Sequence, residues 1–468
     1  MNARIQIATI ALAALIAPAG RAQVMGGMGG FGGAGAGRPF GGLSDSLQGG
    51  SRSPKASWRP WLGMNGTYVD NPVYLDSSGQ ITRQNDQRGA NGSWGVSGLK
   101  QLERSSFGGT YMGSVFLNST SKAIRGSSHA GTFGASHRFN RNLFAGVQQM
   151  FGSTLGGYGA GAGFAGLGSG LFGFSDFSFG QIGLGNPLVN SFVDEEIFAN
   201  RVNFSGTSAS MGYQLSLRSM IEVQAGAQFV RRNNRQLSNF NGYFGGASYS
   251  YSLNRSTFLG VNYRAGHFGY PNRFGGNRVQ SLGLFAGRRL SDRASIAGGA
   301  GANYFDSSFI GTVALAPELA ATLGIAAVTQ VQTAQRLTWG GEFLATYRSD
   351  IASFSLLAQR GVSPGNGILF GGIRDIVAAN VSRSFLESKL TTTWNASLSR
   401  NSGILQAQVQ TRYQTGVWVS YRFPSAGLFL NAGGGLRWQR LALTGPYLPS
   451  KVVTVGLGWS PGEQPLFF

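Results

Sequence analysis

The sequence predicts an all-β protein, a transmembrane antiparallel up-and-down β-barrel of about 18 strands with short turns at one end and long loops at the other. Two observations predict this fold. Apolar and polar residues alternate along many segments, which is typical of strands with two different faces. These segments come in pairs joined by short turns rich in Ser, Arg, Asn or Asp, and longer connections rich in Gly separate the pairs.

The N-terminus has the pattern of a cleaved secretory signal peptide covering residues 1–22. Arg4 supplies a positive charge, Ile5–Pro18 is a short apolar core, and Gly20–Ala22 offers small residues at the cleavage position. Residues 23–56 follow and are so rich in glycine that we expect a flexible tail; a plug in the lumen or a tether is the alternative. The barrel is expected over residues 57–468.

The strands of that barrel are expected as eight hairpins and two single runs. The hairpins cover residues 94–111, 134–148, 212–229, 249–263, 282–301, 342–359, 378–397 and 417–435. One alternating run precedes them at 61–69 and another follows at 451–459. Two strands for each hairpin and the two single runs give the count of about 18 strands.

The length and polarity of the strands favour a membrane barrel over a soluble sandwich. The run LQAQVQTRYQTGVWVSYRF (405–423) is about twice the usual strand length of soluble proteins, whereas a tilted transmembrane strand needs about 9–11 residues. A dry core would leave Gln406, Gln408 and Arg412 without enough partners. We therefore expect the apolar face to meet lipid and the polar face to line a water-filled lumen.

This architecture resembles that of Gram-negative outer-membrane β-barrel proteins, porins in particular, over residues 57–468. The resemblance implies location in the outer membrane, short periplasmic turns, long extracellular loops, and a tail in the periplasm. It implies contact with outer-membrane lipid, lipopolysaccharide and the barrel-assembly machinery, and leaves a homo-oligomer open. The last residue, Phe468, resembles the terminal aromatic that this machinery reads, although Ser460–Gly462 separates it from the last run.

The longest connection covers residues 153–199. In general porins the loop at this ordinal position narrows the pore, so the resemblance implies a constriction in which Asp194, Glu195 and Glu196 face a basic wall; a glycine-rich extracellular cap is equally compatible. Gly161–Gly166 matches a dinucleotide-binding pattern but lacks the flanking strand and helix that the pattern requires. Pro317–Gly324 predicts a short helix in another loop.

Charged residues on the lumen side of the predicted strands are mostly basic. The candidate pore-lining residues are Arg138, Arg264, Arg336, Arg348, Arg374, Lys389, Arg412, Arg422 and Arg437. Only Glu222 and Glu342 are acidic on the same face. Rings of basic residues favour anions in a pore; alternatively, they pair with loop acids and stiffen the wall. Arg412, Arg264 and Arg336 are the strongest candidates because they lie away from the short turns.

Other chemistries have little support in the sequence. Trp418, Phe244 and Phe285 are three scattered lumen aromatics, too few for the aromatic track that sugar porins use. The histidines, His129, His137 and His267, show no arrangement with a serine and a carboxylate, so an enzyme is not expected. No metal-ligand spacing is recognisable, no cofactor is expected, and the dispersed arginines argue against nucleic acid.

The sequence therefore predicts an outer-membrane pore for small hydrophilic solutes, with anions or anionic oligosaccharides as the expected partners. The net charge of +20 agrees with anionic partners. Two alternatives stay open: a channel that exports an acidic exopolysaccharide, and a closed barrel with a structural or surface-interaction role.

Overall fold

The structure is a computed structural model, and it describes most of the predicted barrel. The described residues are 56–70, 73–75, 81–83, 87–118, 126–155, 201–234, 237–271, 275–314, 318, 320–321, 324–325, 327–363, 371–387, 389–403, 409–423, 427–440, 445–460 and 464–465. The expected signal peptide, nearly all of the tail, and residues 156–200 of the longest connection lie outside them.

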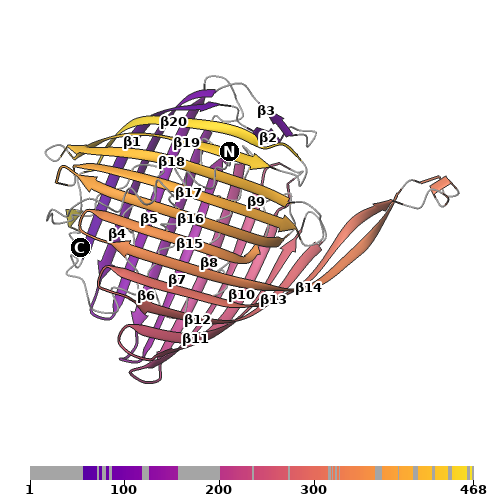
Figure 1. The fold of residues 1–468 in the computed structure, drawn as a ribbon, viewed down its shortest axis with the longest axis horizontal. Coiled ribbons are helices and arrows are strands. Elements are labelled where there is room, and N and C mark those ends of the chain that lie inside the picture. The colour runs from indigo at the N-terminus through magenta and orange to yellow at the C-terminus, as the bar shows by residue number, and fades with distance from the viewer. Residues whose placement is uncertain are drawn as a thin grey trace, which may run out of the picture.

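Eighteen antiparallel strands form a closed barrel (Figure 1). They are β1 (Ala56–Asp70), β4 (Gln87–Gln101), β5 (Ser105–Asn118), β6 (Gly126–Arg138), β7 (Leu143–Leu155), β8 (Arg201–Gln214), β9 (Ser219–Arg232), β10 (Phe240–Ser252), β11 (Thr257–Tyr270), β12 (Gly275–Arg289), β13 (Ala294–Ala314), β14 (Ala327–Arg348), β15 (Ala352–Ser363), β16 (Gly372–Phe385), β17 (Leu390–Gly403), β18 (Val409–Phe423), β19 (Leu428–Arg440) and β20 (Leu448–Trp459). Each strand pairs with its sequence neighbours, and β20 closes the wall against β1 from Leu62↔Trp459 to Asp70↔Lys451. The predicted fold class and all eight hairpins are confirmed.

Three short strands lie outside this set. β2 (Val73–Leu75) and β3 (Ile81–Arg83) pair with each other between β1 and β4. β21 (Gln464–Pro465) pairs with the first residues of β1. The chain therefore returns to the sheet after Trp459, while the expected signal at Phe468 lies outside the described residues. In the expected helix, Glu318, Ala320 and Ala321 have helical backbone.

Short turns join the strands at one end of the barrel. At Asn254 the side-chain Oδ1 atom accepts hydrogen bonds from the backbone N–H groups of Ser256 (2.9 Å) and Thr257 (2.8 Å). Asn140 makes the equivalent turn between β6 and β7. Leu386 and Glu387 lie in the connection between the register partners Phe385 and Leu390, and their φ values of 51° and 57° are in the left-handed region that tight turns between twisted strands use. The Ser- and Asn-rich turn sequences thus set where each hairpin reverses.

The two faces of the wall differ as predicted. On β12 the outward Leu282 and Leu284 are 57% and 69% exposed, whereas the inward Asn277 is 2% exposed. Outward aromatic residues, among them Tyr249 and Tyr347, are exposed close to the short turns. An exposed apolar band with aromatic residues near its edge is what a lipid-facing surface needs.

Many inward aromatic rings lie over a glycine of the adjacent strand. The register pairs are Trp61–Gly95, Phe144–Gly212, Phe204–Gly152, Phe244–Gly226, Phe258–Gly287, Phe285–Gly260, Trp418–Gly433 and Phe429–Gly458. A Cβ atom on any of these glycines would lie 2.1–2.5 Å from the nearest atom of its partner ring. The missing side chain lets the ring lie along the wall instead of projecting into the lumen.

One hairpin extends beyond the wall. β13 has 21 residues and β14 has 22, and they pair with each other along their whole length. The pairing of β14 with β15, however, ends at Gly341↔Arg360. Residues 327–340 of β14 therefore continue past β15, and the β13–β14 hairpin projects from the end that carries the long connections (Figure 1).

The aromatic–glycine pairs predict that the stability of the barrel depends strongly on the paired glycines. Gly212→Ala places a Cβ atom 2.2 Å from the Cζ atom of Phe144 and forces the ring into the lumen. The free energy of unfolding should fall by about 1–3 kcal/mol. Gly146 also faces inward, but a Cβ atom there has no neighbour closer than 3.5 Å. Gly146→Ala should therefore change the free energy of unfolding by less than about 0.5 kcal/mol. Urea unfolding in detergent measures both; equal midpoints for the two variants would refute the packing argument.

Candidate functional site in the lumen

The inner face of the barrel is rich in uncharged polar side chains. Asn431, Gly456, Asn65 and Asn91 are successive register partners, so three amides share one inward row across four strands. The hydroxyl of Ser281 donates to the Oδ1 atom of Asn303 at 2.5 Å. Amides and hydroxyls both donate and accept hydrogen bonds, so this surface suits water and polar solutes.

The structure places the predicted basic residues in four parts of the barrel. Arg138, Arg348, Lys389 and Arg422 lie beside the short turns, Arg264 lies midway along its strand, Arg336 is on the projecting hairpin, and Arg374, Arg412 and Arg437 lie near the long connections. The last three are referred to below as the mouth arginines. They lie within one sector of four strands, on β16, β18 and β19, whereas the other six do not form one group.

The mouth arginines alternate with amide side chains. Arg374 is the register partner of Asn401, Arg412 of Gln439, and Arg437 of Gln414. No carboxylate shares their inward parity on the described residues of β16 to β19. This sector of the inner wall therefore combines positive charge with hydrogen-bonding groups.

Arg264 has a different environment from the mouth arginines. Its side chain is buried, as is that of Glu222 on β9. Electrostatic attraction links Arg264 to both Glu222 and Glu342. The positive charge of Arg264 is thus balanced by the two acidic residues predicted for the lumen, and Arg264 contributes to the wall and not to the charge of the passage.

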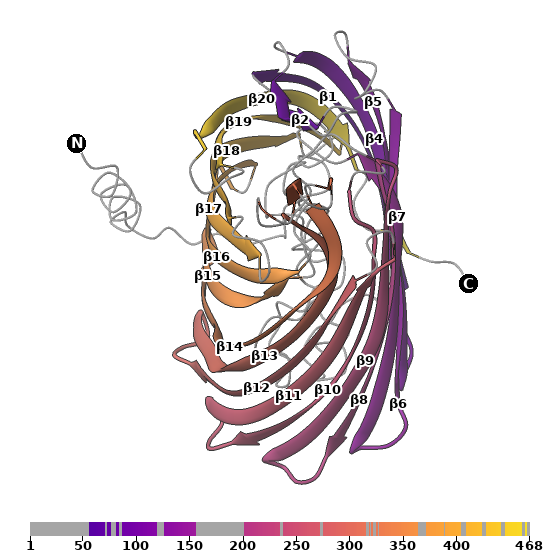
Figure 2. The same ribbon diagram turned by 90° about the vertical axis from the view of Figure 1, so that its right-hand side faces the viewer.

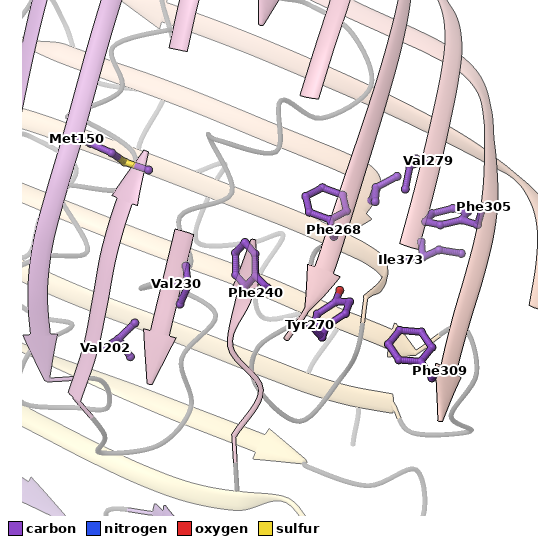
Figure 3. Close-up of a cluster of buried hydrophobic side chains, with 11 residues drawn as sticks. Met150, Val202, Val230, Phe240, Phe268, Tyr270, Val279, Phe305, Phe309 and Ile373 are labelled. Carbon is purple, nitrogen blue, oxygen red and sulfur yellow. The ribbon is translucent and has the colours of Figure 1, made fainter. Parts of the chain in front are cut away.

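An apolar cluster covers part of the inner face of β7 to β13 (Figure 3). Phe268, Tyr270 and Phe305 belong to it, and so do Val362 and Ile373 from the β15–β16 hairpin. Gly371, with φ of 73°, approaches Asn277 and Tyr270 so closely that a Cβ atom would lie 1.8 Å and 3.1 Å from their polar atoms. The tip of the β15–β16 hairpin, residues 361–363 and 371–373, therefore lies inside the barrel against β11 to β13.

This tip was not predicted from the sequence. The expected constriction was the connection 153–199, but Asp194, Glu195 and Glu196 lie outside the described residues. The count of three lumen aromatics was too low, because Phe258, Phe268 and Phe305 share the inward parity and could have been recognised by it. Arg232, buried and inward at the long-connection end of β9, was also missed.

The three histidines lie on the outward face. His129 stacks on Tyr111 and their side chains are hydrogen-bonded at 2.8 Å, and His137 is hydrogen-bonded to Ser105 at 2.8 Å. His267 is exposed on β11. Among the residues that the structure describes, no group of three or more His, Cys, Asp or Glu is placed to hold a metal ion. The described part of the chain also contains no helix long and apolar enough to cross a membrane.

A closed barrel with an apolar exterior and a polar interior is the architecture of outer-membrane β-barrel proteins, and with 18 strands this fold is porin-like. No protein-family model and no curated protein matches the chain. Among solved structures it is similar to Acinetobacter baumannii OccAB4, at 10% identity and a TM-score of 0.42, over 87% of this chain and 99% of that one.

Two further solved structures show similar values. A BenF-like porin from Pseudomonas fluorescens Pf-5 has 10% identity and a TM-score of 0.41, with 86% of this chain and 98% of that chain covered. Pseudomonas aeruginosa OpdL has 12% identity and a TM-score of 0.39, with 86% and 99% covered. At these values we infer no solute preference from them.

The Arg264 environment predicts a charge-specific loss of stability. Arg264→Gln leaves Glu222 and Glu342 without their cation, and the free energy of unfolding should fall by about 3 kcal/mol. Adding Glu222→Gln and Glu342→Gln should restore most of the lost stability, because no unpaired charge then remains at these three positions. Arg348→Gln, exposed beside a short turn, is the control. Urea unfolding in detergent compares the variants, and a triple variant no more stable than Arg264→Gln would contradict the assignment.

Proposed function

We propose that the protein is an outer-membrane pore for small hydrophilic solutes, with a preference for anions. The observation that carries the proposal is the inner face, where amides and hydroxyls are frequent and eight of the described aromatic rings lie over glycines of the adjacent strand. Such a lumen stays hydrated and open to polar solutes. The proposal puts the short turns in the periplasm and the long connections, with the mouth arginines, on the extracellular side.

The mouth arginines support the anion preference. Three arginines, of which Arg374 is largely buried, lie on the inward positions of β16 to β19 near the long connections, and no described carboxylate shares those positions. A guanidinium group binds carboxylate or phosphate with two parallel hydrogen bonds, and basic rings in a pore attract anions. The neighbouring Gln and Asn side chains could bind hydroxyl groups, so small anionic or sugar-acid solutes suit this sector.

A closed barrel is the second candidate, and one observation favours it. The β15–β16 tip packs against β11 to β13 inside the barrel, and therefore occupies part of the passage. Figure 2 shows β4 to β7 on one side of the barrel and β15 to β19 on the other. Single-channel conductance of the refolded, full-length protein in a planar bilayer decides between the two candidates.

The first prediction concerns selectivity. Replacing Arg374, Arg412 and Arg437 together by Gln should move the reversal potential under a salt gradient toward that of a non-selective pore, because the mouth loses its positive charge. The matched control replaces the outward Arg231, Arg278 and Arg288 by Gln, an equal change in net charge. If both triple variants shift the reversal potential equally, overall charge rather than the mouth sets selectivity.

The second prediction concerns the tip. Gly371→Val forces a Cβ atom against Asn277 at a positive φ, so the tip should leave its position and the single-channel conductance should rise. Ile373→Ser, which weakens the apolar contact instead, should have the same effect. Gly92→Val, with no atom within 4 Å of its Cβ position, is the control. An unchanged conductance in both tip variants, with the barrel folded, would show that the tip does not limit the passage.

A further inference from the structure

A row of four charged side chains and one threonine crosses the outer face of the barrel on five neighbouring strands. Its members are successive register partners, from β15 to β19: Arg360, Asp375, Arg400, Thr411 and Arg440. They share the outward parity of the exposed Val377 and Tyr413. We call this set the outer arginine row. The surrounding outer surface carries many exposed apolar side chains.

The row lies at the edge of the apolar band. Each member is within four residues of the strand end that carries the long connections. The next outward row toward the middle of the wall is apolar and aromatic, and consists of Ala358, Val377, Leu398, Tyr413 and Trp438. Aromatic girdles mark the boundary of the hydrocarbon layer, so the arginines lie one row above it, at the level of the lipid headgroups.

The positive charge of the row is only partly neutralised. Asp375 forms a salt bridge with Arg360 at 2.6 Å, and the Arg360 guanidinium also lies 4.6 Å from the centroid of the Trp339 ring. The guanidinium of Arg440 lies 4.9 Å from the centroid of the Tyr447 ring. Within the described part of the chain, no salt bridge reaches Arg400 or Arg440, and the Nε atom of Arg440 is buried without a hydrogen-bond partner.

A cavity of about 420 Å³ lies on this row. Arg400, Thr411, Arg440 and Asp375 line its polar side, where the Asp375 carboxylate is already paired with Arg360. Val377, Leu398 and Tyr413 line its apolar side, and Ile376 and Tyr447 complete the lining. The polar side offers two guanidinium groups and a hydroxyl, which together suit a phosphate. The apolar side faces the hydrocarbon layer and suits an acyl chain. A soluble anion would use only the polar side of the cavity. A phosphorylated lipid has a phosphate for the polar side and an acyl chain for the apolar side.

We propose that this cavity binds a phosphorylated glycolipid of the outer leaflet, with its phosphate between Arg400 and Arg440 and an acyl chain along Leu398. The inference rests on the outer-membrane location in the proposed function, but not on conduction. A barrel that conducts no ions could still bind the lipid, and a conducting barrel could fail to bind it. The two proposals therefore fail separately.

The test is native mass spectrometry of the full-length refolded protein in detergent, titrated with diphosphorylated lipid A. Arg400→Gln with Arg440→Gln should weaken the apparent dissociation constant at least tenfold, and Thr411→Val should weaken it by a smaller factor. The control pair, Arg231→Gln with Arg278→Gln, also lies outward near the long connections and should change it less than twofold. The heat-dependent gel mobility of each variant checks that the barrel is folded.

Two further ligands distinguish the source of the phosphate. Dephosphorylated lipid A should bind the wild-type protein as weakly as diphosphorylated lipid A binds the Arg400/Arg440 variant. Inorganic phosphate alone, at millimolar concentration, should not displace the lipid. Equal binding of the two lipids, equal losses in the control pair, or full displacement by inorganic phosphate would each overturn the proposal of a lipid phosphate site.

Discussion

The packing of aromatic rings over glycines of the adjacent strand is the interaction on which the rest of this barrel depends. A wide barrel with bulky inward side chains would lose its water-filled interior, and one with only small inward residues would have few apolar contacts to fix its register. Rings such as Phe144 and Phe285 avoid both outcomes because each covers the backbone of Gly212 or Gly260. The ring gains a contact, the register is specified by the pair, and the inner surface remains available to Asn and Ser side chains. Part of the large number of glycines in the chain, 75 of 468 residues, is explained in this way.

Successive side chains of a strand point to opposite faces of the sheet, and on β16 to β19 this alternation separates two sets of arginines. Arg412 and Arg437 face the lumen, while Arg400 and Arg440 face outward, although Arg437 and Arg440 are only three residues apart. A slip of one residue in register would exchange the two sets, placing guanidinium groups against hydrocarbon and aromatic girdle residues in water. The Trp418–Gly433 pair on β18 and β19 opposes such a slip. Glycine–aromatic pairing therefore protects the charge pattern of the wall as well as its packing.

The strands and their two faces were predictable from the sequence because they depend on local alternation and on turn residues. LNRST (253–257) encodes both the end of β10 and the reversal that Asn254 stabilises. Properties that depend on depth or on contacts across the lumen were not predictable. Arg264 and Arg412 both occupy inward positions, yet Arg264 is buried beside the opposite charges of Glu222 and Glu342. Arg336 also occupies an inward position, but lies where β14 has already passed β15. Ile373 has outward parity and is nevertheless buried inside the barrel.

The behaviour of Ile373 follows from the strand pairing. Because β14 stops pairing with β15 at Gly341↔Arg360, residues 361–363 of β15 have no described strand beside them on that side, whereas the first residues of β16 still pair with β17. Their outward face, carrying Val362 and Ile373, would otherwise be exposed at the edge of the barrel. Turning inward buries these residues against Phe305 and Phe309 on the inner face of β13. The long β13–β14 hairpin and the inward tip are thus two consequences of one interruption in the sheet, so a change in the length of that hairpin would also change the width of the mouth.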